Sequence, residues 1–171
     1  MDAGKDREYA AMKDRTVVER KSERELTITR TFDAPARIVY QAWTDPELFK
    51  RWWVPKSVDM TLLSCELDVR TGGRYRLEFG HPASEKPVVF FGRYLEVTPG
   101  SRMVWTNEES EEGSVTTVTF EERAGKTLLV MHELYPSKEA LDTSIGEMPE
   151  GLRETFGQLD ELLATLVGAK R

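Results

Sequence analysis

Few side chains in this sequence could carry out chemistry, and His132 is the most informative of them. The chain has two histidines and one cysteine. Alternation along a predicted strand groups His132 with Leu128 and Val130, which predicts an inward-facing imidazole. In a pocket, a neutral imidazole orients a ligand or acts as a base near neutral pH. In a core it is only a hydrogen-bonded packing residue, and the sequence leaves both interpretations open.

The common motifs of metal and nucleophilic catalysis are missing. His132-Glu133 is not followed by the second histidine that a zinc-binding HExxH motif needs. The single cysteine, Cys65, lies within a predicted strand and indicates packing rather than reactivity. There is no glycine-rich phosphate loop and no G-x-S-x-G elbow. We therefore expect no metal and no cofactor, and we assign no catalytic residue.

Composition excludes several classes of protein. A chain of 171 residues fits one domain, and a net charge of −6 argues against a dedicated nucleic-acid binder. One cysteine rules out an internal disulfide and favours a reducing compartment. No apolar run approaches the length of a membrane span, and the first residues are too charged for a signal peptide. The expectation is a soluble cytoplasmic protein.

The elements that must position these side chains begin with a helix near the end of the chain. Residues 148–167 place large apolar side chains at alternating steps of four and three, which predicts one buried stripe: Leu152, Phe156, Leu159, Leu163 and Leu166. The polar residues of this helix fall mostly on the other, solvated faces: Arg153, Glu154, Gln158, Asp160 and Glu161. Such a helix is not stable alone, so the rest of the chain must cover its stripe.

The preceding chain reads mainly as strands. A strand at 25–32 is followed by a helix that ends at Thr44-Asp45-Pro46 and by a second short helix, PELFKRWW. Six strands follow at 58–69, 74–79, 87–97, 102–107, 114–122 and 127–134, joined by short turns that include Ala124-Gly125-Lys126. This order, β-α-α-β6-α, predicts an α+β domain over residues 25–168 with an antiparallel sheet.

The first 24 residues mix charges of both signs with few large apolar side chains. This composition predicts a mobile N-terminal tail. The alternative is that part of the segment forms a short helix or strand against a partner.

Five segments carry a resemblance to a known family. They are FDAPARIVYQAWTDPELFKRWW (32–53), DVRTGGRYRLEF (68–79), GRYLEVTPGSRMVWT (92–106), TVTFEE (117–122) and MPEGLRETFGQLDELL (148–163). Together they resemble the START-like, or Bet v 1-like (SRPBCC), superfamily, in the branch named after the activator of heat-shock-protein-90 ATPase. The resemblance implies a helix-grip fold, in which a curved sheet grips the last helix and the two short helices close a cavity between them. Relatives use this cavity for lipids, polyketides, plant hormones and other apolar molecules.

The residues themselves are consistent with a cavity. Strand alternation turns several aromatic and apolar side chains toward the last helix, and pockets are typically apolar with a few oriented polar groups. The predicted ligand-binding residues are Trp53, Tyr75, Phe79, Met103, Trp105, Asn107, His132, Met148, Leu152 and Phe156.

Three functions remain open. The first, which we favour, is non-catalytic binding of a small apolar or aromatic molecule. The second is a cyclase- or hydrolase-type enzyme that uses His132, Tyr75 or Asn107 in the same cavity. The third is stimulation of a chaperone ATPase through the outer surface, with the chaperone as partner. A homodimer is compatible with all three.

Overall fold

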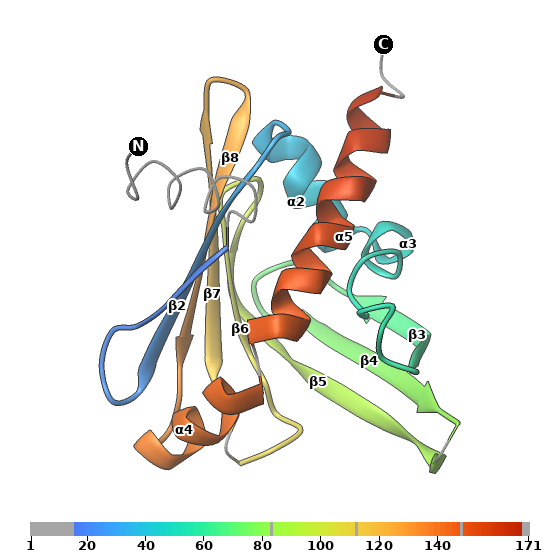
Figure 1. Cartoon of the computed structure of the whole chain (residues 1–171), viewed down its shortest axis with the longest axis vertical. Helices are drawn as coiled ribbons and strands as arrows, with labels where there is room; N and C mark the ends of the chain where they lie inside the picture. Colours follow the sequence, from blue (N-terminus) through green and yellow to red (C-terminus); the bar gives the residue numbers. More distant parts are fainter. Residues whose placement is uncertain (1–15, 83, 112, 148, 169–171) are drawn as a thin grey trace, which may run out of the picture.

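A single curved antiparallel sheet forms the body of the protein (Figure 1). The computed structural model describes residues 16–82, 84–111, 113–147 and 149–168. Within them the eight strands are ordered β1-β2-β8-β7-β6-β5-β4-β3. The strands are β1 (Val17–Arg20), β2 (Glu25–Phe32), β3 (Thr61–Leu67), β4 (Arg74–His81), β5 (Ser84–Thr98), β6 (Arg102–Thr106), β7 (Val115–Arg123) and β8 (Lys126–Leu134). Every pairing is antiparallel, which confirms the predicted sheet.

Four helices in the described part of the chain lie with this sheet, and the last of them is the predicted amphipathic one. They are α2 (Ala36–Thr44), α3 (Pro46–Phe49), α4 (Lys138–Glu147) and α5 (Pro149–Gly168). On α5, Phe156, Leu159 and Leu163 are fully buried, as the stripe predicts. Two of the five residues expected on its solvated faces are instead drawn into the structure. Gln158 is buried, and the carboxylate of Asp160 pairs with the guanidinium of Arg30, which extends inward from β2.

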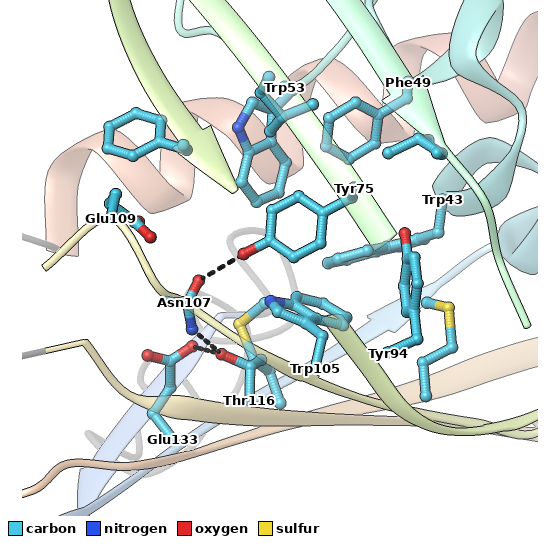
Figure 2. A pocket seen from close by; sticks show the side chains of 15 residues that line it. Trp43, Phe49, Trp53, Tyr75, Tyr94, Trp105, Asn107, Glu109, Thr116 and Glu133 are labelled. Atoms are coloured by element: carbon cyan, nitrogen blue, oxygen red, sulfur yellow. Dashed lines mark hydrogen bonds between the residues drawn. The ribbon is translucent and has the colours of Figure 1, made fainter. Parts of the chain in front are cut away.

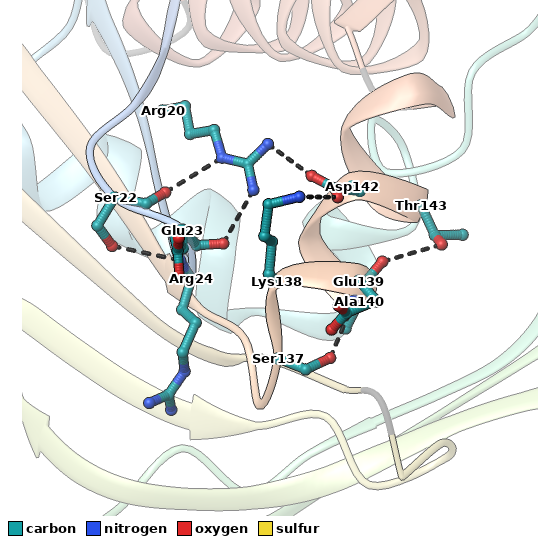
Figure 3. Close-up of polar contacts among 10 residues, drawn as sticks. All are labelled: Arg20, Ser22, Glu23, Arg24, Ser137, Lys138, Glu139, Ala140, Asp142 and Thr143. Carbon is teal, nitrogen blue, oxygen red and sulfur yellow. Dashed lines mark hydrogen bonds and ion pairs between the residues drawn. The ribbon is translucent and has the colours of Figure 1, made fainter.

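Two elements were not predicted, and they contact each other. Val17–Arg20, inside the expected tail, form strand β1 on the edge beside β2. Lys138–Glu147 form α4, whose Leu141 is fully buried. Figure 3 shows the link: Arg20 donates to Asp142 at 2.6 Å, and Lys138 donates to the other oxygen of that carboxylate at 3.0 Å. The folded part therefore begins before residue 24, and the remainder of the predicted tail, residues 1–15, lies outside the described residues.

The sheet bends along strands β3 and β5. Register shifts between Leu62 and Ser64 and between Tyr94 and Glu96 each insert an extra residue, which bends a strand and increases its twist. In Figure 1, β3, β4 and β5 run away from the direction of β2, β7 and β8. The two groups of strands therefore diverge across the curved sheet.

The turn between β7 and β8 decides which face of β8 looks inward. Ala124 and Gly125 both have positive φ, 52° and 79°, and Arg123 pairs directly with Lys126. This is a two-residue hairpin turn rather than the predicted turn of three. A shift of one residue moves every side chain of a strand to the opposite face. Leu129, Met131 and Glu133 therefore share the inner face with Val118 and Thr116, and the predicted inward set containing His132 is wrong.

Among the described helices, none is both long enough and apolar enough to cross a membrane.

Candidate ligand-binding site

A cavity of about 250 Å³ lies between the inner face of the sheet and the segment that contains α2 and α3 (Figure 2). Its lining comes from α2, α3 and six strands or their ends: Trp43, Phe49, Trp53, Leu67, Tyr75, Leu77, Phe90, Tyr94, Met103, Trp105, Asn107, Glu109, Thr116, Met131 and Glu133. No described residue of α5 lines it. The expected cavity between the sheet and the last helix is thus displaced toward the two short helices.

Seven of the fifteen lining residues are aromatic, and several of their rings contact one another. Trp43 packs edge-on against Trp53 and tilted against Trp105, with ring centroids 6.0 and 6.1 Å apart. Phe49 stacks on Trp53 with a centroid distance of 4.7 Å. Rings in contact with one another hold their positions, so this wall is a preformed surface for a flat apolar molecule.

The sequence around α3 explains how Trp53 comes to face the cavity. Asp45 caps α3 by accepting from the amide of Glu47 at 3.0 Å, and Pro46 occupies the first turn. Trp52, fully buried, donates its indole N–H to the carbonyl of Ala42 at 2.9 Å. Trp52 therefore anchors α3 on α2, and the neighbouring Trp53 is left to line the cavity.

Helix α5 supports this segment through Gln158. The side-chain nitrogen of Gln158 donates to the carbonyls of Trp52 (2.9 Å) and Val54 (2.8 Å), and its oxygen accepts from the amide of Lys56 at 2.8 Å. These three bonds satisfy main-chain groups in a stretch without regular secondary structure. Gln158 thus positions Trp53 without reaching the cavity itself.

The polar groups of the cavity form a chain of hydrogen bonds (Figure 2). The Tyr75 hydroxyl donates to the carbonyl of Thr106 at 2.7 Å and lies 3.2 Å from Oδ1 of Asn107. Nδ2 of Asn107 donates to Oγ1 of Thr116 at 3.0 Å, and that hydroxyl donates to Glu133 at 2.9 Å. The chain fixes the orientation of the Asn107 amide and ends on a carboxylate.

Two carboxylates, Glu109 and Glu133, line the cavity, and the described lining residues include no lysine, arginine or histidine. Burial raises the pKa of Glu109 above its ordinary value, and the neighbouring charge of Glu108 raises it further. Burial is also the main reason why the pKa of the Tyr75 hydroxyl is raised, with smaller contributions from Glu109, Glu108 and Glu133. The electrostatic environment of the cavity is therefore negative.

Five of the ten predicted ligand-binding residues line this cavity: Trp53, Tyr75, Met103, Trp105 and Asn107. Phe79 is buried and does not line the cavity; it packs edge-on against Phe90, which does. Leu152 is half-buried and Phe156 is fully buried, and both pack in the core beneath α5. Met148 lies outside the described residues.

His132 is on the outer face of the sheet. Its Nε2 lies 3.0 Å from Oε1 of Glu25 on the adjacent strand β2, and about a third of its side chain is exposed. This ends both of the roles considered for it, as a ligand-orienting group and as a base in the cavity.

Ten of the fifteen lining residues were not among the predicted ligand-binding residues, and they include Trp43, Met131, Glu109 and Glu133. For Met131 and Glu133 the sequence did contain a usable pattern, since a two-residue Ala124-Gly125 turn pairs Val118 with Met131 and Thr116 with Glu133. Glu109 is one of several acidic residues in a loop, and no pattern in the sequence distinguishes it from its neighbours.

Comparisons with known proteins agree with this fold. The family model described as Activator of Hsp90 ATPase homolog 1-like protein matches residues 33–164. A crystal structure from Rhodobacter sphaeroides superimposes with a TM-score of 0.81 at 23% identity, covering 88% of this chain and 99% of the other.

Two further structures are similar. One from Mycobacterium smegmatis has a TM-score of 0.74 at 26% identity, covering 88% of this chain and 99% of the other. One from Staphylococcus epidermidis has a TM-score of 0.75 at 26% identity, covering 87% and 94%. A comparison with curated proteins found no match.

Proposed function

This chain belongs to the family of Activator of Hsp90 ATPase homolog 1-like proteins, with the START-like helix-grip fold, and we propose that it binds a small apolar or aromatic molecule without transforming it. The observation that carries the proposal is the aromatic-lined cavity between α2, α3 and the sheet. Protein interiors are otherwise close-packed, and side chains that face a void lose dispersion contacts. A ligand of matching shape restores those contacts.

The size of the cavity limits the ligand. A void of about 150 Å³ lined by apolar side chains holds a benzene molecule. By the same scale, the cavity of about 250 Å³ holds roughly ten non-hydrogen atoms. This corresponds to a bicyclic aromatic or a substituted benzene, not to a long-chain lipid.

Titration with indole and with naphthalene tests the proposal, because each has about the right size and no charge. Three of the four tryptophans line the cavity, so their fluorescence reports occupancy directly. We expect saturable binding of one molecule per chain by fluorescence and by calorimetry. Binding that does not saturate, or no binding by either compound, would contradict the proposal.

Two variants assign the binding to the cavity. Trp105→Ala removes a wall and should weaken binding roughly tenfold, because an aromatic contact of this kind contributes about 0.5–1.5 kcal/mol beyond its buried area. Leu67→Trp should fill the cavity and abolish binding. Phe91→Ala is the matched control, since Phe91 is an aromatic residue of β5 that is 43% exposed and does not line the cavity.

The enzyme alternative keeps Tyr75 and Asn107 in the cavity but loses the imidazole of His132. Recovery of the bound compound unchanged after prolonged incubation supports simple binding. Appearance of a product that depends on Tyr75 or Asn107 would favour catalysis instead.

A surface role in chaperone stimulation rests on a different part of the molecule. Arg74, Arg76 and Arg93 surround the exposed ring of Phe91 in a hollow on the outer face of β4 and β5. Basic side chains around an exposed aromatic residue are typical of a protein contact. Stimulation of an Hsp90 ATPase that survives Leu67→Trp but is lost in Phe91→Ala would favour this role over ligand binding.

A further inference from the structure

The two charged side chains of the cavity differ in how well they are satisfied. Glu133 accepts hydrogen bonds from three hydroxyls, those of Ser114 (2.7 Å), Thr116 (2.9 Å) and Tyr135 (3.1 Å). The Glu109 carboxyl group accepts from the amide of its own residue, but its Oε2 is shielded from solvent and has no hydrogen-bond partner among the described residues. A buried acceptor without a donor costs free energy, and such atoms are rare in native structures. A bound molecule could therefore supply the hydrogen-bond donor that Oε2 of Glu109 lacks.

A second unsatisfied group belongs to Trp43, which also lines the cavity. Trp43 is only 3% exposed, and its indole Nε1 is buried without an acceptor among the described residues. Buried indole N–H groups usually find an acceptor. Figure 2 shows Glu109 on the same side as Asn107 and Glu133, whereas Trp43 is on the other side of the cavity. Lining residues on two sides of the cavity thus each carry a buried polar atom without a partner among the described residues, an acceptor on Glu109 and a donor on Trp43.

The space between these groups is aromatic. Trp53, Tyr75 and Trp105 line it, and the faces of such rings attract cations as well as apolar groups. With two carboxylates and no cationic side chain among the described lining residues, a positively charged ligand is the one that complements the cavity.

From this we infer that the ligand is a small aromatic amine in its ammonium form, with an oxygen acceptor at the end away from the nitrogen. The ammonium donates to Glu109, the aromatic body lies among Trp53, Tyr75 and Trp105, and the oxygen accepts from Trp43. This inference rests on the proposed function, because it names the class of ligand for the same cavity.

A set of compounds of nearly equal size tests the charge. Tyramine has about ten non-hydrogen atoms, an ammonium at one end and a hydroxyl at the other. In tyrosol a hydroxyl replaces the ammonium, and in 4-hydroxyphenylacetate a carboxylate replaces it. We expect tyramine to bind at least about tenfold more tightly than tyrosol, and the anion to bind weakest, because one charge-assisted hydrogen bond accounts for such a ratio.

Variants of one loop assign the preference to Glu109. Glu109→Gln keeps the size of the side chain and an acceptor oxygen but removes the charge. It should lower tyramine affinity by about tenfold and leave tyrosol affinity within about twofold. Glu111→Gln is the matched control, since Glu111 is an exposed acid of the same loop and does not line the cavity. A circular dichroism spectrum and thermal midpoint for each variant establish that it is folded.

The pH dependence gives a second, independent measurement. The titratable groups around Glu109 are Glu108 in its own loop, whose charge raises the Glu109 pKa, and two groups that line the same cavity, Glu133 from β8 and the Tyr75 hydroxyl from β4. Since its pKa is raised in the free protein, tyramine affinity should fall as the pH falls through that value. Tyrosol affinity should not fall over the same range.

The outcomes separate this inference from the proposed function. Tyrosol or 4-hydroxyphenylacetate binding as tightly as tyramine overturns the amine inference, and binding of indole or naphthalene then leaves the proposed function standing. Loss of tyramine affinity in Glu111→Gln as large as in Glu109→Gln also overturns it. If no compound of either set binds, both proposals are wrong.

Discussion

The two halves of the sheet differ in how completely their inward-facing apolar side chains fill the space next to them. Beneath α5, the inner faces of β2 and β8 are filled by fully buried side chains such as Leu26, Ile28 and Leu129. Toward β4, β5 and β6, larger side chains face inward, including Tyr75, Tyr94 and Trp105, yet they enclose a cavity. The larger rings fill space less completely because the bulged strands bend away from α5.

The two halves also differ in the polar and charged side chains that they bury. The filled half buries Arg30, but pairs it with Asp160 and Thr16 and packs its guanidinium against the rings of Phe32 and Phe156. The hollow half leaves Glu109 Oε2 and Trp43 Nε1 without partners among the described residues. Both halves therefore bury polar groups, and in the hollow half the two atoms without partners among the described residues belong to side chains that line the cavity.

The largest expected effect compares a ring from each half. Phe156→Ala should lower the free energy of unfolding by about 3–5 kcal/mol, or the midpoint by roughly 6–20 °C, because Phe156 packs on all sides. Trp105→Ala should cost less than half as much, since one side of this ring already faces the cavity. Chemical denaturation measures both. Equal losses would mean that the two halves are packed alike.

A smaller effect is expected where α5 supports the wall of the cavity. Gln158→Ala leaves the carbonyls of Trp52 and Val54 and the amide of Lys56 without their partners. A loss of about 1–3 kcal/mol in stability is expected from such groups, together with weaker ligand binding. Glu161→Ala, at an exposed position of the same helix, is the control. Unchanged affinity in Gln158→Ala would show that Trp53 is held by other contacts.

Glu109→Gln should act in the opposite direction on stability. Its folded-state pKa is raised, so the native state binds the proton more tightly than the unfolded chain, and stability falls as the pH rises through that pKa. The variant should therefore melt slightly above the wild type at pH 7. The difference should disappear as the pH falls below 4.5, the ordinary value. A lower midpoint at pH 7 would mean that Glu109 is a structural residue.

The smallest effect is expected on the outer face. His132→Gln replaces a partly exposed ring whose contact is Glu25, and exposed pairs of this kind contribute little. Tyramine and indole should bind as they do to the wild type, with a midpoint within about 2 °C. A large loss of ligand affinity would mean that His132 faces the cavity, which would contradict the register of β8.

The sequence was sufficient for those features that depend on periodicity over many residues. The stripe of α5 and the alternation of β4, β6 and β7 predict the fold and place Tyr75, Met103 and Trp105 on the correct face. Elements that are short or have a weak hydrophobic pattern were not predicted. Strand β1 has four residues and is stabilised by pairing with β2, and α4 has only a weak apolar periodicity.

The site was harder to predict because it depends on details of one or two residues. Leu128, Leu129, Val130 and Met131 are all apolar, so either face of β8 could have been the buried one. Only the length of the Ala124-Gly125 turn decides between them. The path of the loop places Glu109, rather than another of its acidic residues, at the cavity. Nothing in the sequence of the loop predicts that path.

The position of β2 between β1 and β8 has a consequence for the order of folding. Phe32 pairs with Thr127 and Glu25 with Leu134, so this pairing closes a loop containing most of the domain, whereas β7 and β8 meet across a two-residue turn. Local hairpins form quickly, and contacts between distant segments form late because loop closure costs entropy. In stopped-flow experiments, Val118→Ala should slow folding, whereas Ile28→Val should mainly accelerate unfolding. During synthesis, the apolar face of β2 therefore remains unpaired until β8 has emerged from the ribosome.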